Sequence, residues 1–336
     1  MKKMALEKIV VTGAAGFMGS HFLRLMVNKH PECNFINLDK LTYAGNLDNV
    51  QDLDGKPNYE FILGDICDSS FMNYLLKDTD VVFHFAAESH VDNSIEGSLD
   101  FTKANTFGTH VLLEAAKKNS VKEIVYISTD EIYGEVLEGA SKETDLLCPT
   151  NPYAASKAAA EMIIKGYEKT YNLPIKIVRG SNNLGPFQYP EKIVSCFATL
   201  LLQNKKVPLH GSGKNQRTWI YVEDFAKAVE VIFERGKIGE VYNVGTPYVI
   251  SNLDLTKMIL QRFGKDESYI NYIQDRPFND ARYHVDSSKL LSLGWTPKVS
   301  LEEGIDRTIE WYKKNQRWWK NVYKKMSGKN ENPNNF

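Results

Sequence analysis

Tyr153 and Lys157 form a pair whose residue types and spacing suit proton transfer. They lie four residues apart in segment 151–157 (NPYAASK), so a helix beginning there would carry both on one face. A neighbouring ammonium, together with a positively charged nicotinamide, would lower the pKa of the tyrosine toward the working pH. The YxxxK pattern is common, and its alternative is a surface pair without chemistry. Its position after a dinucleotide-binding region makes it informative.

Asp130 and Glu131 are a second group that could do chemistry. They follow the apolar segment 123–128 (EIVYIS), where a strand would end. Two adjacent carboxylates repel each other, so stability alone explains them poorly. An exposed acidic turn or a helix N-cap is the alternative explanation.

A glycine-rich segment could bind a dinucleotide. Gly13, Gly16 and Gly19 are spaced as GxxGxxG in 12–20 (TGAAGFMGS). Such glycines let the backbone turn tightly and approach a pyrophosphate, which then faces a helix N-terminus. Asp39 ends the next apolar segment, where a carboxylate accepts hydrogen bonds from an adenosine ribose and repels a 2′-phosphate. This favours NAD over NADP, although the neighbouring Lys40 weakens the argument.

Alternating strand and helix patterns must position these groups. Strands are expected at 8–12, 34–38, 59–63, 81–85, 123–128 and 175–178, and helices at 17–29, 100–118 and 153–171. Apolar strands alternating with helices predict an α/β fold, a Rossmann-type doubly wound parallel sheet with both faces covered. Ligands bind at the carboxyl ends of such strands, where Gly64-Asp65-Ile66 and Phe85-Ala86-Ala87 lie.

The regular alternation of strand and helix patterns ends after Arg179, where turn-forming segments separate shorter elements. We therefore expect an NAD-binding domain at 1–180 and a smaller substrate domain at 181–326. Segment 217–243 is expected to return to the first domain. The polar, Asn-rich residues 327–336 are expected to form a loose tail.

Composition narrows the function classes. The 336 residues carry a formal net charge of -1 without a long basic run, so we expect neither a nucleic-acid nor a membrane partner. The four cysteines include no CxxC pair, which argues against a metal site and a disulfide framework and fits a cytoplasmic protein.

The chain resembles the extended short-chain dehydrogenase/reductase superfamily and, within it, the nucleoside-diphosphate-glucose 4,6-dehydratases. The resemblance spans roughly residues 7–320, and the Thr-Asp-Glu triplet at 129–131 is its most specific part. Beyond the glycine turn and YxxxK, it rests on 41–47 (LTYAGNL), 64–68 (GDICD), 86–92 (AAESHVD), 181–183 (SNN), 190–192 (PEK), 221–224 (YVED) and 275–277 (DRP).

The resemblance implies a reaction that converts dTDP-glucose to the 4-keto-6-deoxy sugar, as in deoxysugar and rhamnose biosynthesis. Tyr153 takes the C4 hydroxyl proton while hydride leaves C4 for NAD, Glu131 removes the C5 proton, and Asp130 protonates the departing C6 hydroxyl. Hydride then returns to C6, so NAD is regenerated and should stay tightly bound. Two carboxyl groups in opposite protonation states suit this elimination. Lys157 and Thr129 complete the implied catalytic set.

The resemblance also implies ligand contacts and assembly as a homodimer through helices 100–118 and 153–171. Cofactor contacts are expected from Gly13, Gly16, Phe17, Met18, Gly19, Asp39, Lys40, Thr42, Asp65, Ile66, Phe85, Ala86, Ala87, Tyr153, Lys157 and Asn183. Nucleotide-sugar contacts are expected from Ser89, Thr129, Asn182, Lys192, Ile193, Pro208, His210, Arg217, Asn252, Arg276 and Asn279.

Several residues depart from the pattern of bacterial dTDP-glucose enzymes. Those enzymes typically carry arginine at Asn93, tyrosine at His210 and Gly-His at Phe278-Asn279. The variants here resemble UDP-glucose 4,6-dehydratases of rhamnose synthesis, so UDP-glucose is the alternative substrate. Thymine and uracil differ by one methyl group, worth about 1 kcal/mol. A C4 epimerase or a reductase of the same superfamily is a further alternative, but epimerisation needs no C5 base or C6 acid.

Overall fold

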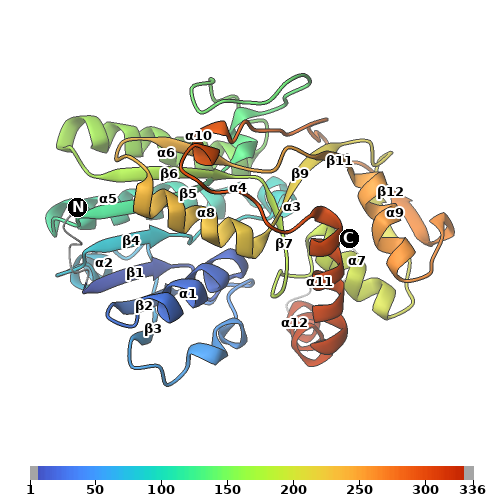
Figure 1. Cartoon of the computed structure of the whole chain (residues 1–336), viewed down its shortest axis with the longest axis horizontal. Coiled ribbons are helices and arrows are strands. Elements are labelled where there is room, and N and C mark those ends of the chain that lie inside the picture. Colours follow the sequence, from blue (N-terminus) through green and yellow to red (C-terminus); the bar gives the residue numbers. More distant parts are fainter. Residues whose placement is uncertain (1–6, 329–336) are drawn as a thin grey trace.

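The computed structural model describes residues 7–328, and its larger part is built on a seven-stranded sheet (Figure 1). The strand order is β10-β6-β5-β4-β1-β2-β3, and every neighbouring pair is parallel. The strands are β1 (Lys8–Thr12), β2 (Asn34–Asp39), β3 (Tyr59–Leu63), β4 (Val81–His84), β5 (Glu123–Thr129), β6 (Ile175–Gly180) and β10 (Val241–Val244). This confirms the predicted Rossmann-type fold.

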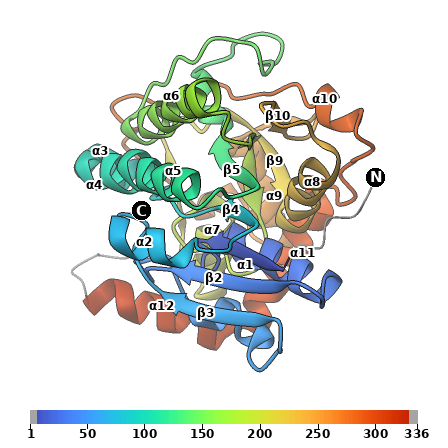
Figure 2. The same ribbon diagram turned by 90° about the vertical axis from the view of Figure 1, so that its left-hand side faces the viewer.

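Helices cover both faces of this sheet because successive strand residues point to opposite faces. Val11 and Phe83 pack in one core beneath α1 (Phe17–Lys29) and α8 (Val222–Arg235). Val10 and Val82 pack in the other core beneath α2 (Ser69–Leu75), α5 (Thr109–Lys118) and α6 (Pro152–Tyr171). Figure 2 shows α5 and α6 on one side of the sheet and α8 on the other.

The helix expected over 100–118 is interrupted. It consists of α4 (Ser98–Phe101), a π-helical segment (Thr102–Gly108) and α5, and it follows α3 (Val91–Glu96). Asn105, in the π-helical segment, is buried and bonds both backbone groups of Glu88 and the hydroxyl of Ser156 at 2.8–2.9 Å. The wider turn thus ties the loop after β4 to the helix that carries Tyr153.

A smaller lobe is built on a three-stranded sheet, β11-β9-β7, and a two-stranded sheet, β12-β8, around a third core. Its strands are β7 (Asn182–Leu184), β8 (Val207–His210), β9 (Gln216–Tyr221), β11 (Val249–Ser251) and β12 (Ile270–Ile273). Its α-helices are α7 (Ile193–Leu202), α9 (Asn252–Arg262), α11 (Leu301–Lys314) and α12 (Gln316–Gly328), whereas α10 (Ser288–Leu291) packs beside β10 of the large sheet.

Segment 217–243 divides between the two lobes. β9 lies in the small sheet, whereas α8 packs against α1 and β10 pairs with β6 in the large sheet. The tail expected at 327–336 falls outside the described residues, apart from residues 327 and 328 at the end of α12. Within residues 7–328, no helix is both long and apolar enough to cross a membrane. All four cysteines are free thiols.

Candidate active site

The glycine turn lies between β1 and α1, against the end of β4. Gly13 has a φ of 71°, and a Cβ there would lie 2.5 Å from the nitrogen of Ala86. A Cβ on Gly19 would lie 2.5 Å from the carbonyl oxygen of Gly13. Phe17, Met18 and Gly19 form the first turn of α1. Larger residues would therefore push the turn away from the sheet. That would displace the helix N-terminus, which can receive a pyrophosphate.

The acidic end of β2 is fixed by backbone donors. Asp39 accepts hydrogen bonds from the nitrogens of Ala15 (3.0 Å) and Leu41 (2.8 Å), and its burial raises its pKa. Lys40 is exposed and pairs with Asp65 at 2.7 Å, at the end of β3. The lysine charge therefore has its own carboxylate partner beside Asp39.

Buried polar atoms at the strand ends fit a polar cofactor. Within residues 7–328, Ser128 Oγ, Asp130 Oδ2 and Asn183 Oδ1 are buried without a hydrogen-bond partner. A polar ligand bound at these strand ends would supply the missing partners. Together with the glycine turn and Asp39, these atoms are consistent with a bound dinucleotide.

Helix α6 brings Tyr153 and Lys157 to the carboxyl end of β5. The Asn151 side chain caps the helix by accepting from the nitrogen of Ala154 at 2.8 Å, and Pro152 suits its first turn. Lys157 Nζ donates to the carbonyl oxygen of Ile127 at 2.7 Å, and burial lowers the pKa of this lysine to about 7.

The expected lowering of the tyrosine pKa needs the nicotinamide charge as well as Lys157, and the protein groups alone do not produce it. Burial raises the pKa of Tyr153, and the negative charge of Glu131 raises it further. Lys157 is not among the groups that act on the Tyr153 pKa; its ammonium donates to the Ile127 carbonyl and lies 4.2 Å from the centroid of the Tyr126 ring. Any activation of the phenol must come from a positive charge added beside it.

Asp130 and Glu131 stand in a single 3₁₀ turn after β5, with Thr129 as its N-cap. Asp130 is 3% exposed, and burial followed by the charge of Glu131 raises its pKa to about 7. Glu131 Oε2 accepts from Asn151 Nδ2 at 3.2 Å, which joins this turn to the start of α6. The charges of Glu131 and Asp130 both raise the pKa of Tyr153. The structure thus brings the five candidate catalytic residues together.

Two contacts join the lobes across the strand ends. Arg276 forms a two-pronged ion pair with Asp92 of α3, with nitrogen–oxygen distances of 2.6 and 2.8 Å. Lys192 Nζ donates to the carbonyl oxygen of Ser89 at 3.0 Å. Cationic residues expected at the diphosphate therefore already face the loop and helix after β4.

Arg217 is held within the small lobe. It is buried, donates to the Asp280 carbonyl oxygen at 2.9 Å and to Asn279 Oδ1 at 3.1 Å, and lies 4.1 Å from the Tyr283 ring centroid. His210 shares a hydrogen bond of 3.2 Å with the Gln274 carbonyl oxygen. These contacts gather Arg217, Asn279 and His210 around the segment that follows β12.

The other expected contact residues are placed by their elements. Asn182 and Asn183 lie in β7, Pro208 in β8, Ile193 and Asn252 at the starts of α7 and α9, and Thr42, Ile66, Phe85, Ala86 and Ala87 in loops after β2, β3 and β4. Thr42 is exposed.

Some polar residues at this site were not singled out from the sequence. Asp92 holds Arg276, and Glu191 is buried, accepts from the Tyr43 hydroxyl at 3.2 Å and has its pKa raised to about 7 by burial. Asp92 lies in motif 86–92 and Glu191 in motif 190–192, and membership of these motifs was the only sequence feature that could have identified them. Their partners are distant in sequence, so spacing gave no reason to select them.

One cluster of metal-ligand types occurs away from the site. His30, Glu230 and Glu234 have ligand atoms within 4.8 Å of one another. Lys29 Nζ contacts the two carboxylates at 2.7 and 3.1 Å, so a cation already neutralises them. This cluster gives no support for a metal centre.

Comparisons with known proteins agree with this arrangement. The family model described as GDP-mannose 4,6 dehydratase matches residues 10–308. A dTDP-D-glucose 4,6-dehydratase from Mus musculus is 44% identical over 95% of this chain and 92% of its own length. A second relative, from Arabidopsis thaliana, is also 44% identical, over 94% of this chain. It is a trifunctional UDP-glucose 4,6-dehydratase, UDP-4-keto-6-deoxy-D-glucose 3,5-epimerase and UDP-4-keto-L-rhamnose-reductase. The chain spans only 49% of the length of this relative.

A solved structure extends the match to three dimensions. DesIV, a dTDP-glucose 4,6-dehydratase from Streptomyces venezuelae solved with NAD bound, superimposes with a TM-score of 0.91 at 40% identity, covering 94% of this chain and 99% of that chain. Sequence, fold and the Thr129-Asp130-Glu131 turn therefore agree. The chain belongs to the GDP-mannose 4,6 dehydratase family and, within the short-chain dehydrogenase/reductase superfamily, to the nucleoside-diphosphate-glucose 4,6-dehydratases.

Proposed function

We propose that this chain is an NAD-dependent hydro-lyase that converts dTDP-glucose to dTDP-4-keto-6-deoxyglucose. The observation that carries the proposal is the turn after β5, where buried Asp130 with a pKa near 7 stands beside Glu131 and both act on Tyr153. Relatives with this activity are 44% identical over nearly the whole chain. A C4 epimerase would need Tyr153 but neither carboxyl group.

The residues that would hold NAD surround the carboxyl ends of β1, β2 and β4. We assign the pyrophosphate to Gly13, Gly16, Phe17, Met18 and Gly19, the adenosine end to Asp39, Lys40, Thr42, Asp65 and Ile66, and the nicotinamide end to Phe85, Ala86, Ala87, Tyr153, Lys157 and Asn183. When bound, NAD accepts a hydride from C4 of the sugar and returns it to C6. We also propose the domain division at 180, with α8 and β10 returning to the large sheet; Asn183, in β7, lies just beyond this boundary.

The chain's own residues handle the protons. Tyr153, whose pKa the positive nicotinamide of bound NAD would lower, accepts the C4 hydroxyl proton, and Thr129 would donate a hydrogen bond to the resulting phenolic oxygen. Oxidation at C4 acidifies the C5 hydrogen, which Glu131 removes. Asp130, protonated below its raised pKa, gives its proton to the departing C6 hydroxyl, so one water molecule leaves. A proton then returns to C5, and the product differs from the substrate by one water.

The nucleotide is assigned to the groups at the boundary between the lobes. Arg276, Arg217 and Lys192 would face the diphosphate, since guanidinium groups suit phosphate oxygens. Ser89 and Asn182 would hold the sugar. Ile193, Pro208, His210, Asn252 and Asn279 would contact the remaining nucleotide, and His210 and Asn279 are two of the departures that make UDP-glucose the second candidate substrate.

Reaction in D₂O tests the proposed chemistry. Conversion of dTDP-glucose should give a product that has lost one water and carries one solvent deuterium at C5. Glu131→Gln should abolish both changes, while Glu135→Gln, which alters the carboxyl group that binds the Ala281 nitrogen, should retain both. Water loss without deuterium at C5 would contradict the elimination, and an isomer of unchanged mass would indicate an epimerase.

We further propose a homodimer that pairs through α4, the π-helical segment and α6. Leu99, Phe107 and Met162 are 83%, 51% and 49% exposed on these neighbouring helices, which share one flank in Figure 2. Large exposed apolar side chains on adjoining helices are typical of an interface. Light scattering should give twice the chain mass for the wild type and the single mass for Leu99→Glu; a monomeric wild type would refute the proposal.

The free cysteines support a cytoplasmic location.

A further inference from the structure

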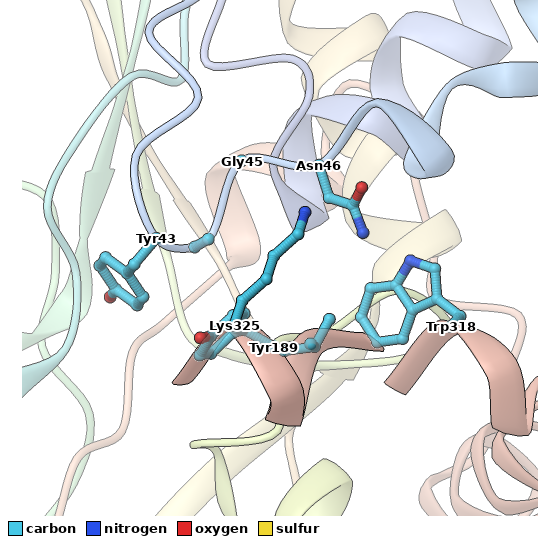
Figure 3. A pocket seen from close by; sticks show the side chains of 8 residues that line it. Tyr43, Gly45, Asn46, Tyr189, Trp318 and Lys325 are labelled. Carbon is cyan, nitrogen blue, oxygen red and sulfur yellow. The ribbon is translucent and has the colours of Figure 1, made fainter. Parts of the chain in front are cut away.

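Helix α12 lies against the loop that follows β2, although the two are about 270 residues apart (Trp318 and Asn49 are separated by 269 positions). Figure 3 shows a small pocket between them, with Tyr43, Gly45 and Asn46 on one side and Trp318 and Lys325 of α12 near it. Trp318 also belongs to the core of the small lobe. The last described helix therefore connects that lobe to the expected cofactor region.

A buried hydrogen-bond chain runs from this helix to the glycine turn. Trp318 Nε1 donates to Asn49 Oδ1 at 2.9 Å, and Asn49 Nδ2 donates to the Ala15 carbonyl oxygen at 2.8 Å. Asn49 is 1% exposed, so water does not replace either bond. The other side of the same turn is fixed by Asp39, which accepts from the Ala15 nitrogen at 3.0 Å.

The indole is itself held in place by other aromatic rings. Trp318 meets Trp311 edge to face at a centroid distance of 5.2 Å, and Phe187 at 6.0 Å. Phe187 has a φ of 64°, an unusual conformation for this residue, and Arg24 of α1 lies 5.3 Å from its ring centroid. The direction of the Trp318 N–H bond is therefore set by packing from both lobes.

We infer that Trp318 and Asn49 are positioning residues for the dinucleotide turn, and that retention of NAD depends on α12. They orient the Ala15 peptide, and with it the amides at the start of α1, toward the pyrophosphate. This inference rests on the proposed NAD-dependent function. It also couples the small lobe, which carries the proposed nucleotide contacts, to the strength with which the large lobe holds its cofactor.

Trp318→Phe tests the inference because it keeps an aromatic ring and removes the N–H donor. We expect the NAD dissociation constant to rise roughly three- to thirtyfold, since an unsatisfied buried acceptor is left on Asn49. Calorimetry on cofactor-stripped protein measures this constant directly, and the fraction of NAD retained after extensive dialysis gives a second readout without turnover. Trp311→Phe is the matched control, because it alters the same aromatic cluster but leaves the bond to Asn49.

Asn49→Asp tests the second half of the chain independently. Its carboxylate can still accept from Trp318 Nε1 but can no longer donate to Ala15, so NAD should bind at least as weakly as in Trp318→Phe. Equal NAD affinity in Trp318→Phe and wild type, or equal weakening in Trp318→Phe and Trp311→Phe, would overturn the inference. If Trp318→Phe does not fold, unchanged affinity in Asn49→Asp would overturn it. Wild-type protein that binds no NAD would instead refute the proposed function.

Discussion

The pH dependence of turnover follows from the environment of Asp130. This carboxyl group is 3% exposed, and burial beside Glu131 raises its pKa from 3.8 to about 7. The proposed acid works only when protonated, so kcat with saturating dTDP-glucose should fall as pH rises above 7. About a tenth of the acid remains protonated at pH 8 and about a hundredth at pH 9, which predicts a roughly tenfold loss per pH unit.

Asp130→Asn separates this acid from other groups that titrate nearby. The amide has no proton to give, so kcat at pH 7 should fall on the order of 10²- to 10⁴-fold, and the residual rate should lose the alkaline decline. Asp52→Asn, a change at an exposed ion pair with Arg24, should leave the profile as in the wild type. Initial rates from pH 5.5 to 9 measure all three profiles.

Asp130→Asn should increase stability although it lowers turnover. The folded-state pKa of Asp130 lies above that of the unfolded chain, so the folded state binds the extra proton between about pH 4 and 7. Its contribution to stability is therefore lost as pH rises through that window. At pH 8, Asp130→Asn should raise the free energy of unfolding by roughly 2–4 kcal/mol in urea titrations.

Either of two results would refute this reasoning. An alkaline decline that persists unchanged in Asp130→Asn would assign the titration to another group, such as Lys157, whose pKa burial lowers to about 7. A wild-type kcat that keeps rising through pH 8 would show that turnover does not require an acid with a pKa near 7.

Three further perturbations test separate parts of the site. Glu131→Gln should stop water loss yet still allow transient NADH absorbance after substrate is added, and absence of any absorbance would contradict the order of steps. Asp92→Asn should free Arg276 to bind the diphosphate and tighten dTDP binding about threefold in calorimetry. The gain is small because the partly exposed ion pair competes only weakly with the diphosphate, and weaker binding would contradict this reasoning. Glu161→Gln leaves the buried Arg179 without its carboxylate partner, so it should lower the free energy of unfolding by about 3–5 kcal/mol in urea titrations. An unchanged urea midpoint would show that this ion pair does not stabilise the fold.

The sequence predicted the parallel sheet because short, mainly apolar strand segments alternate with helical segments. Strands expected at 8–12 and 59–63 occur at those residues, and α1 begins at Phe17 as expected. The carboxyl ends of parallel strands share one edge of a sheet, so the glycine turn and the acidic pair were also predicted to lie close together. Local pattern was sufficient for these features.

Features that depend on long-range contacts were not predicted. The π-helical segment contains Asn105, whose amide bonds Glu88 and Ser156, and no helix propensity encodes these long-range bonds. The environment of the Lys157 ammonium was also not predicted, because its hydrogen bond to the Ile127 carbonyl joins it to a different element. The contact between Trp318 and Asn49 joins distant elements, so spacing alone gave no signal for it.

Mass spectrometry of the purified protein, incubated separately with dTDP-glucose and UDP-glucose without added NAD, tests the central claim most directly. The account predicts that dTDP-glucose loses one water and that this conversion needs no added cofactor, because NAD is retained from turnover to turnover. Faster loss of water from UDP-glucose would reassign the substrate to the uracil nucleotide. If both sugar nucleotides remain intact even after NAD is supplied, the dehydratase account is contradicted.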